Sequence, residues 1–304
     1  MKTPCQVTLL AAAFAVAGTI INTAHSQNLF VSSLGTSSVW EFGQNGNLIN
    51  SAFAANLPYP GGVALDKNGN VYVAFNDQPV GGTPRVEEFG PNGNVINASF
   101  AKGFYSPAGI TFDSGGNLYV ASPGGVAKFG PTGNLINGNF ITGLSQAWGI
   151  AIDASGNVYV ADANANTVSK YSPTGHLLNA TFASGLDYPT GLAFDHSGNL
   201  YVASYSSGSV EKIGSSGNLV NANFISGLGA GPESLAFDPI GNLYVGNNGN
   251  GTIEQFDGSG NLLNPFFASA GSGAEYIAFS VPEPAAWSFA VLGIGAVLGL
   301  RRRS

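Results

Sequence analysis

The sequence is poor in the side chains that carry much of enzyme chemistry. Among 304 residues there are one cysteine, Cys5, and three histidines. Cys5 and His25 fall in an N-terminal segment that we expect to be removed, so the remaining chain would have neither a thiol nor a disulfide. His176 and His196 stand in turn-like sequence. A zinc or other transition-metal site is not expected, because such sites need clustered cysteine or histidine ligands.

Charged residues are also scarce, at 9% of the sequence. Without the terminal segments 1–26 and 282–304, residues 27–281 contain six basic and sixteen acidic residues, a net charge of −10. A domain of this sign repels nucleic acid and anionic lipid, so nucleic acid is not an expected partner. The sequence is instead rich in glycine, with 44 residues, and 44% of it is apolar. This composition is typical of an all-β protein with many tight turns.

The N-terminal segment, residues 1–26, is predicted to be a secretory signal peptide. Lys2 precedes an apolar run from Val7 to Ile21, and the small residues Ala24 and Ser26 follow the run. Cleavage after Ser26 would export the chain. The alternative is an uncleaved membrane anchor, for which the apolar run is short.

The C-terminal segment, residues 282–304, combines a short proline motif, an apolar stretch and a basic cluster. The three parts are Pro282, Glu283 and Pro284, then residues 285–300, then Arg301, Arg302 and Arg303. Their order resembles the bacterial PEP-CTERM sorting signal. The resemblance implies transient anchoring in the inner membrane through a C-terminal transmembrane helix and recognition by an exosortase that cuts near the triplet. It also implies delivery to the cell surface or extracellular matrix, where such proteins are associated with exopolysaccharide.

Between these segments one decapeptide recurs. "DHSGNLYVAS", residues 195–204, is nearly repeated as "DKNGNVYVAF", "DSGGNLYVAS", "DASGNVYVAD" and "DPIGNLYVGN". The asparagine before the apolar element falls at positions 28, 70, 117, 157, 199 and 242, which gives intervals of 40 to 47 residues. A period of this length with several strand-like elements is typical of a β-propeller. Four such elements per period predict six blades of four strands within residues 27–281.

The order of the elements predicts how the ring closes. Residues 27–281 begin with the second element of a blade and end with a first element, Tyr276–Ser280. The C-terminal strand must therefore join the three N-terminal strands, which hides the sheet edges. The motif "GLAFDHSGNLYVAS" resembles the NHL repeat and, more loosely, the gluconolactonase-like six-bladed propellers. The resemblance implies the fold, but this scaffold hosts enzymes and binding proteins alike.

The turn of the repeat, Asp-x-x-Gly-Asn, is suited to backbone capping. The aspartate can accept local N–H bonds, and Gly-Asn tolerates the left-handed conformation of a tight hairpin. The turn aspartates are Asp66, Asp113, Asp153, Asp195 and Asp238. Calcium is the alternative ligand, although the spacing lacks the dense run of oxygen ligands that calcium takes. No other cofactor is expected. We call the face that carries these turns, and from which both termini should emerge, the bottom face.

Ligand-binding residues are expected on the opposite, top face, where the loops differ between blades. The position before the first-strand glycine is occupied in turn by Gly61, Ala108, Trp148, Thr190, Glu233 and Glu275. Glu233 and Glu275, on adjacent blades, could bind a cation or a sugar hydroxyl, or could be solvated rim residues. The top loops also carry Tyr59, Phe104, Tyr105, Trp148, Tyr188 and Tyr205. These aromatic residues suit either sugar stacking or packing onto the blades.

Two further candidates come from the gluconolactonase-like resemblance, which implies carboxylates and asparagine around a central divalent ion. Asp162 and Asn247 are the residues that could join Glu233 and Glu275 in such a site. The sequence favours a non-enzymatic, exported propeller that binds a polysaccharide or a partner protein in the matrix. The alternatives are a divalent-metal-dependent hydrolase or lyase of gluconolactonase type, and a purely structural matrix component.

Overall fold

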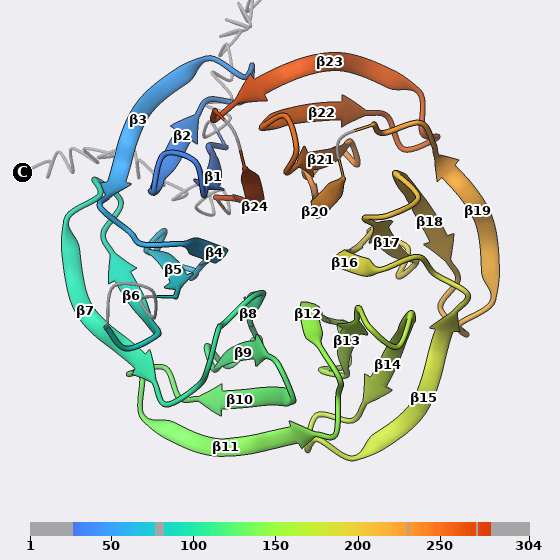
Figure 1. Cartoon of the computed structure of the whole chain (residues 1–304), viewed down its shortest axis with the longest axis horizontal. Helices are drawn as coiled ribbons and strands as arrows, with labels where there is room; N and C mark the ends of the chain where they lie inside the picture. The colour runs from blue at the N-terminus through green and yellow to red at the C-terminus, as the bar shows by residue number, and fades with distance from the viewer. Residues whose placement is uncertain (1–26, 77–81, 230, 272, 281–304) are drawn as a thin grey trace, which may run out of the picture.

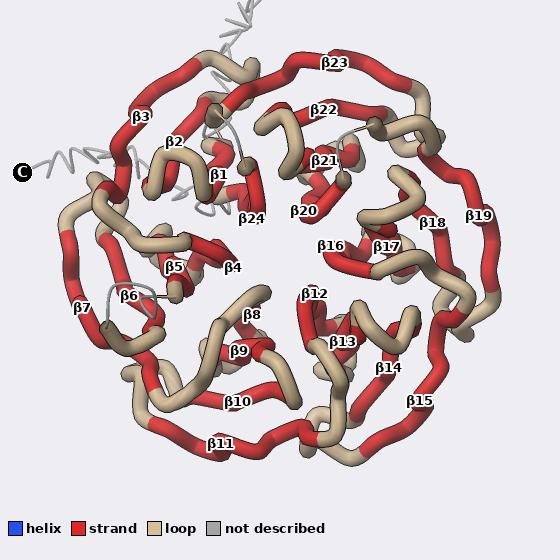
Figure 2. Tube along the Cα trace, viewed as in Figure 1, coloured by secondary structure: helices blue, strands red, loops and turns tan. Residues whose placement is uncertain are grey.

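The computed structural model shows six β-sheets arranged as blades around a central axis (Figure 1). It describes residues 27–76, 82–229, 231–271 and 273–280, so the predicted signal peptide and sorting tail lie outside the described residues. The regular secondary structure that it describes is strand, joined by turns and loops (Figure 2). In this part of the chain no helix has the length and apolar character needed to cross a membrane. The predicted all-β six-bladed propeller is confirmed.

Each blade is an antiparallel sheet of four strands, which follow one another from the axis outward. The first blade consists of β24 (Ala274–Phe279), β1 (Leu29–Ser33), β2 (Ser38–Phe42) and β3 (Leu48–Ala55). The second consists of β4 (Pro60–Leu65), β5 (Val71–Phe75), β6 (Arg85–Phe89) and β7 (Val95–Lys102). The third consists of β8 (Ile110–Phe112), β9 (Leu118–Ser122), β10 (Gly125–Phe129) and β11 (Leu135–Thr142). The fourth consists of β12 (Ala147–Ile152), β13 (Val158–Asp162), β14 (Thr167–Tyr171) and β15 (Leu177–Ser184). The fifth consists of β16 (Pro189–Phe194), β17 (Leu200–Ser204), β18 (Ser209–Ile213) and β19 (Leu219–Ile225). The sixth consists of β20 (Pro232–Phe237), β21 (Leu243–Asn247), β22 (Thr252–Phe256) and β23 (Leu262–Ser269).

The hydrophobic core lies between neighbouring blades. Each of the six core clusters combines side chains of two adjacent blades. Tyr201 of β17 is typical: its ring meets Phe224 of its own blade and Phe237 of the next blade edge-on, with both centroid separations 4.9 Å. All five residues of β17 are buried, as its continuous apolar run predicts. Because every core is shared, each blade depends on its neighbours for stability.

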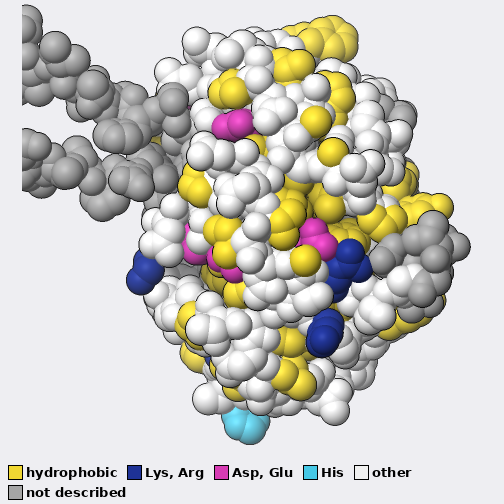
Figure 3. Space-filling view, turned by 90° about the vertical axis from the view of Figure 1, so that its left-hand side faces the viewer, with side chains coloured by type: hydrophobic (Ala, Val, Ile, Leu, Met, Phe, Trp, Pro, Cys, Tyr) yellow, Lys and Arg dark blue, Asp and Glu magenta, His cyan; other side chains and the backbone are white. Residues whose placement is uncertain are grey.

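The outer strands form the circumference of the ring. Each begins with two half-exposed apolar residues, such as Val95 at 55% and Ile96 at 52% exposure in β7. On the side that β3 and β7 face, apolar side chains are scattered over the surface and charged side chains are few (Figure 3). The outer strands are therefore polar through asparagine, serine and threonine rather than through charge.

The recurrent bottom turn is held by its aspartate. Asp195 Oδ1 accepts hydrogen bonds from the backbone N–H groups of Ser197 and Asn199, both at 2.9 Å. Its Oδ2 accepts from Asn199 Nδ2 at 2.8 Å and from the Tyr201 hydroxyl at 3.2 Å. Gly198 has a φ of 79°, in the left-handed region that favours glycine. The turn and the interblade tyrosine are thus linked, which explains why the decapeptide is repeated as a unit.

The ring closes as the order of elements predicts. β24 pairs antiparallel with β1, with Leu29 opposite Phe279 and Val31 opposite Ile277. The Ser280 N–H donates to the Asn28 carbonyl at 2.9 Å, which extends the ladder past the strand ends. The first blade therefore contains strands from both ends of the described chain (Figure 1).

Glycine allows the innermost strands to approach one another around the axis. A Cβ placed on Gly149 of β12 would lie 1.9 Å from the Thr190 carbonyl oxygen of the next blade. In β20 and β24 the corresponding positions are Ser234 and Tyr276, so the inner strands of blades six and one carry a side chain where the other four blades carry glycine. The candidate site lies beside these two strands.

Candidate functional site

A cavity of about 400 Å³ lies at the top end of the inner strands, on the side of blades four, five, six and one. We call it the mouth cavity. Its lining residues are Trp148, Tyr188, Thr190, Tyr205, Ser206, Glu233, Asn248 and Glu275. Four of these share one register position on β12, β16, β20 and β24, because the propeller places equivalent residues side by side around the axis.

Glu233 is the most buried carboxylate of the mouth cavity, with 3% of its surface exposed. Trp148 Nε1 donates to Glu233 Oε1 at 3.2 Å, although Trp148 belongs to the fourth blade and Glu233 to the sixth. Asn248, which follows β21, donates through Nδ2 to the other carboxylate oxygen. Burial raises the pKa of Glu233 to about 7, and the two hydrogen bonds offset part of that rise.

Glu275, on the next inner strand, is a second carboxylate in the same electrostatic environment. Burial raises its pKa to about 8, and the negative charge of Glu233 adds to the rise. In the described part of the chain no hydrogen bond reaches the Glu275 carboxylate. The neighbouring Tyr276 is buried, and burial together with the nearby charges of Glu233 and Glu275 raises the pKa of its hydroxyl. Near neutral pH the Glu233–Glu275 pair therefore retains a proton, because two negative charges this close together are unfavourable.

An aromatic wall flanks the carboxylates. The Trp148 and Tyr188 ring centroids are 6.2 Å apart, and those of Tyr188 and Tyr205 are 6.1 Å apart. Tyr188 has a φ of 57°, and its N–H donates to Asn166 Oδ1 at 2.9 Å, which fixes the loop ahead of β16. A Cβ on Gly231 would lie 2.6 Å from the Tyr205 ring, so glycine at this position leaves room for that ring. The wall runs from half-buried Trp148 to Tyr205, which is 37% exposed.

The other sequence candidates are placed elsewhere. Asp162 and Asn247 both end the second strand of their blade and do not line the mouth cavity. Asp162 accepts hydrogen bonds from the loop before β12, namely from the N–H and hydroxyl of Ser145 and from the Gln146 N–H. Although burial opposes ionisation, these bonds lower the pKa of Asp162. Asn247 is fully buried and donates to Glu254 Oε1 at 3.2 Å.

Of the remaining top-face aromatic residues, only some approach the axis. Tyr59 lines a hollow of about 220 Å³ that adjoins the mouth cavity and shares Trp148 and Glu275 with it. Phe104 instead packs edge-on against Phe129 of its own blade, with centroids 5.9 Å apart. Tyr105 is 63% exposed. For Phe104 the structure therefore agrees with packing onto the blade.

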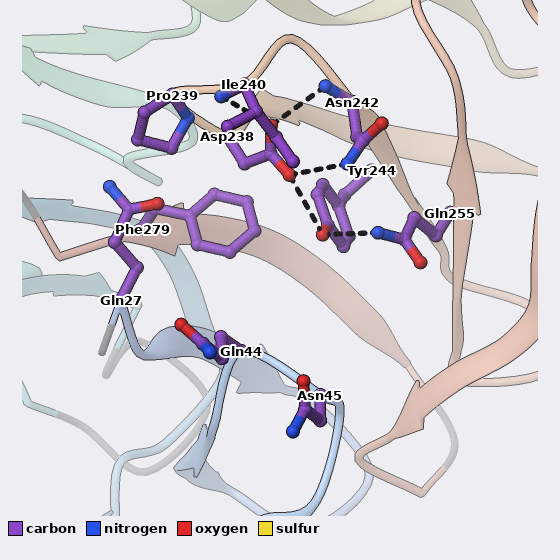
Figure 4. A pocket seen from close by; sticks show the side chains of 10 residues that line it. All are labelled: Gln27, Gln44, Asn45, Asp238, Pro239, Ile240, Asn242, Tyr244, Gln255 and Phe279. Carbon is purple, nitrogen blue, oxygen red and sulfur yellow. Dashed lines mark hydrogen bonds between the residues drawn. The ribbon is translucent and has the colours of Figure 1, made fainter. Parts of the chain in front are cut away.

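A hollow of about 440 Å³ lies on the bottom face, and the polar groups that the sixth blade contributes to it bond to one another (Figure 4). Asp238 accepts from the backbone N–H groups of Ile240 and Asn242, from Asn242 Nδ2 and from the Tyr244 hydroxyl. Gln255 Nε2 in turn donates to the Tyr244 hydroxyl at 2.6 Å. The polar groups of the repeated turn in this hollow are thus bonded to one another, whereas Gln44 and Asn45 line it from the first blade (Figure 4).

Sequence reasoning missed two residues that line the mouth cavity. Asn248 and Ser206 lie in loops after second strands, where the repeat pattern gives no guide to side-chain direction. Tyr276, which replaces the repeated glycine in β24, lines the adjoining hollow instead. Among the described residues, no group of three or more His, Cys, Asp or Glu side chains is arranged to hold a metal ion.

Two family models match parts of the chain. The NHL repeat matches residues 144–171, and a β-propeller repeat matches residues 176–210. Both matches fall on blades four and five, in agreement with the repeats read from the sequence. A comparison with curated proteins gives no significant match.

Solved structures with the same fold come from proteins of different kinds. A chain in the crystal structure of a nidogen/laminin complex has a TM-score of 0.71 at 18% identity, and the match covers 85% of this chain and 100% of that one. A Bacteroides caccae protein of unknown function has a TM-score of 0.64 at 18% identity, with 84% and 98% covered. A gluconolactonase-like protein has a TM-score of 0.56 at 18% identity, with 72% and 84% covered. At these identities the similarity establishes the fold alone.

Proposed function

We propose that this protein is an exported, non-enzymatic binding or scaffold protein that acts at the cell surface or in the exopolysaccharide matrix. Its ligand, a polysaccharide or a matrix protein, binds at the mouth cavity. The observation that carries the proposal is the meeting of the Trp148–Tyr188–Tyr205 wall with the Glu233–Glu275 pair. An aromatic surface beside a few convergent polar groups is the usual composition of a ligand site.

The export route rests on the two terminal segments of the sequence. The segment 1–26 would direct export, and the segment 282–304 would anchor the protein in the inner membrane until an exosortase removes it. Gln27 and Ser280, the outermost described residues, line a hollow with the bottom-turn residues Asp195 and His196. The top face would therefore point away from the membrane, and a partner could reach the mouth cavity before or after processing.

The nidogen/laminin structure supports the idea that a propeller of this shape can serve in a protein complex. It does not support a particular partner, because at this sequence identity the similarity concerns only the fold. The composition of the mouth cavity favours a polysaccharide, because aromatic faces with carboxylate and amide groups suit sugar rings and hydroxyls.

Changes in the mouth cavity are expected to weaken binding without unfolding the ring. Trp148→Ala removes part of the wall, and Glu233→Ala with Glu275→Ala removes the carboxylates. Each should lower the affinity for a matrix ligand at least about tenfold, or roughly 1.4 kcal/mol. A glycan array and a pull-down from matrix extract would find the ligand, and calorimetry would measure the loss.

The matched controls are His196→Ala and Lys67→Ala, both exposed in bottom turns. They should leave affinity and melting temperature unchanged. A ligand that still binds the mouth-cavity variants but not the bottom-turn variants would show that the site lies on the bottom face, against the proposal.

The sorting tail can be tested separately. Replacing Arg301, Arg302 and Arg303 with serine should leave export intact and reduce delivery to the surface or medium. Fractionation followed by immunoblotting measures both, and the intact protein should accumulate in the inner membrane of a host without an exosortase. Normal surface yield from the serine variant would contradict the sorting assignment.

A divalent-metal-dependent hydrolase or lyase is the second candidate, and the paired carboxylates favour it. Glu233 and Glu275 supply two oxygen-ligand groups at the axis, where a central ion could bind. Metal analysis of the purified protein distinguishes the enzyme from the non-enzymatic binding protein: stoichiometric, tightly held Ca²⁺ or Zn²⁺ together with lactonase activity would favour the enzyme. Loss of the metal and of the activity in Glu275→Gln would place the metal site in the mouth cavity.

A further inference from the structure

We infer that the mouth cavity binds a positively charged amino sugar of a polysaccharide, with its ammonium group between Glu233 and Glu275 and its ring against the aromatic wall. The inference rests on the proposed function and names the class of ligand for that site. It follows from the charge, the hydrogen-bonding groups and the shape of the cavity.

The charge of the cavity lacks a protein counterion. Two carboxylates line it, and its lining residues include no lysine, arginine or histidine in the described part of the chain. Burying carboxylates without a counterion is costly, and the raised pKa values of Glu233 and Glu275 reflect that cost. A bound cation would take the place of the retained proton and would allow both carboxylates to ionise.

The hydrogen-bonding groups suit a donor-only ligand. Glu275 lines the cavity and receives no hydrogen bond within the described residues, so both of its carboxylate oxygens can accept from a ligand. An ammonium group has three donors and no acceptor, so these oxygens can receive it. A calcium ion takes six to eight oxygen ligands, of which the two carboxylates would supply at most four.

The wall favours a sugar over a lysine side chain. Trp148 is fixed by its bond to Glu233, and the three rings continue from the carboxylates toward solvent. An amino sugar carries its charge directly on a ring whose apolar face can stack, so one unit meets carboxylates and wall together. Further units of the polymer could follow the wall outward. The net charge of −10 on residues 27–281 also attracts a cationic polymer and repels one rich in uronic acids.

The test compares short glucosamine oligomers with N-acetylated oligomers of equal length, since acetylation removes the charge and leaves the ring. Calorimetry on the purified protein at about pH 6 should show at least about tenfold tighter binding of the amine form. Glu275→Gln and Glu233→Gln should abolish that preference. Glu254 is a half-buried carboxylate of the sixth blade that lies outside the cavity and accepts a hydrogen bond from Asn247, so Glu254→Gln should preserve the preference. The same calorimetry at about pH 6, repeated in buffers of different ionisation enthalpy, should show proton release, because the amine is already charged at that pH while the glutamates still hold protons.

The other outcomes overturn the inference in distinguishable ways. Equal affinity for both oligomers, lost in Trp148→Ala, would make the ligand a neutral sugar and leave the proposed function standing. Tighter binding of a lysine-rich peptide, with the same glutamate dependence, would make the ligand a protein. Binding of Ca²⁺ alone would favour a metal site. Binding unaffected by any mouth-cavity variant, or no binding of any probe, would remove the cavity from both proposals.

Discussion

A chain that ends at Ala270, before β24, is expected to lose cooperative unfolding and to aggregate. The truncation removes the inner strand of the first blade and exposes the N–H and C=O groups along the edge of β1. It also removes Ile277 and Phe279, which pack in the core between the sixth and first blades, where the Phe279 ring meets Tyr244 at 4.7 Å. Losing one large core side chain costs about 3–5 kcal/mol, and a whole strand costs a large part of the roughly 5–15 kcal/mol that stabilises a domain.

The matched control is a chain that ends at Ser280, which keeps β24 and lacks only residues 281–304. Both this chain and the longer one should melt in a single transition when they are followed by circular dichroism and calorimetry. If the chain ending at Ala270 also melted in a single transition at an unchanged temperature, the first blade would not need its C-terminal strand, and the stabilising role of closure would be wrong.

The fold could be predicted from the sequence because each blade repeats the same local instructions. Asp195, Gly198 and Asn199 specify one turn through their own backbone and side-chain bonds, and Tyr201 then fills the space between two blades. These requirements act within ten residues, so they are legible without a structure. Closure followed from the same pattern, since only a strand near Ile277 could complete the first blade.

The site was only partly predictable. Trp148, Glu233 and Glu275 share one repeat position, and a ring necessarily brings equivalent positions together at its axis. Asp162 and Asn247 also share a repeat position, but it lies at the end of a second strand that is buried on both faces. Such a strand has no polar alternation, so its sequence does not tell which side its last residue faces.

The loop contributors depend on conformations that the repeat does not encode. Asn248 reaches Glu233 from a loop, and Tyr205 is accommodated by the absence of a side chain at Gly231. The coupling of Glu233 with Glu275 depends on how closely two blades approach at the axis, which is a tertiary property.

The second large effect expected is a loss of stability with rising pH that Glu275→Gln largely removes. The pKa values of Glu233 and Glu275 rise on folding from 4.5 to about 7 and about 8. Below about pH 4.5 both states hold these protons, so the full stability is present. Between about pH 4.5 and 8 the unfolded chain has released them while the folded chain retains them, so stability falls as pH rises through the folded pKa values.

A carboxyl whose pKa rises from 4.5 to about 7 changes stability by on the order of 3 kcal/mol over this range. Glu275→Gln removes one carboxylate and relieves the repulsion on the other. At about pH 8.5 it should therefore raise the melting temperature by roughly 5 °C or more, and at about pH 5 it should change little. Urea or thermal unfolding across the pH range gives both values.

Other carboxyl groups also make the stability of the folded protein depend on pH, and their contributions must be separated from that of the Glu233–Glu275 pair. Burial also raises the pKa values of Glu41, Glu211 and Glu254, so the parent protein should retain some slope that Glu275→Gln does not remove. In the turns, hydrogen bonds outweigh burial and lower the pKa of Asp195, so its stabilising contribution is lost only at acid pH, below the range from about pH 4.5 to 8.

Glu254→Gln is the control, since its carboxylate lies apart from the mouth cavity. If Glu275→Gln and Glu254→Gln changed the alkaline melting temperature equally, the glutamate pair would have no special coupling. If Glu275→Gln instead lowered that temperature, the pair would be stabilised as two charges, and the cavity would not favour a cation in the way the protonated pair implies.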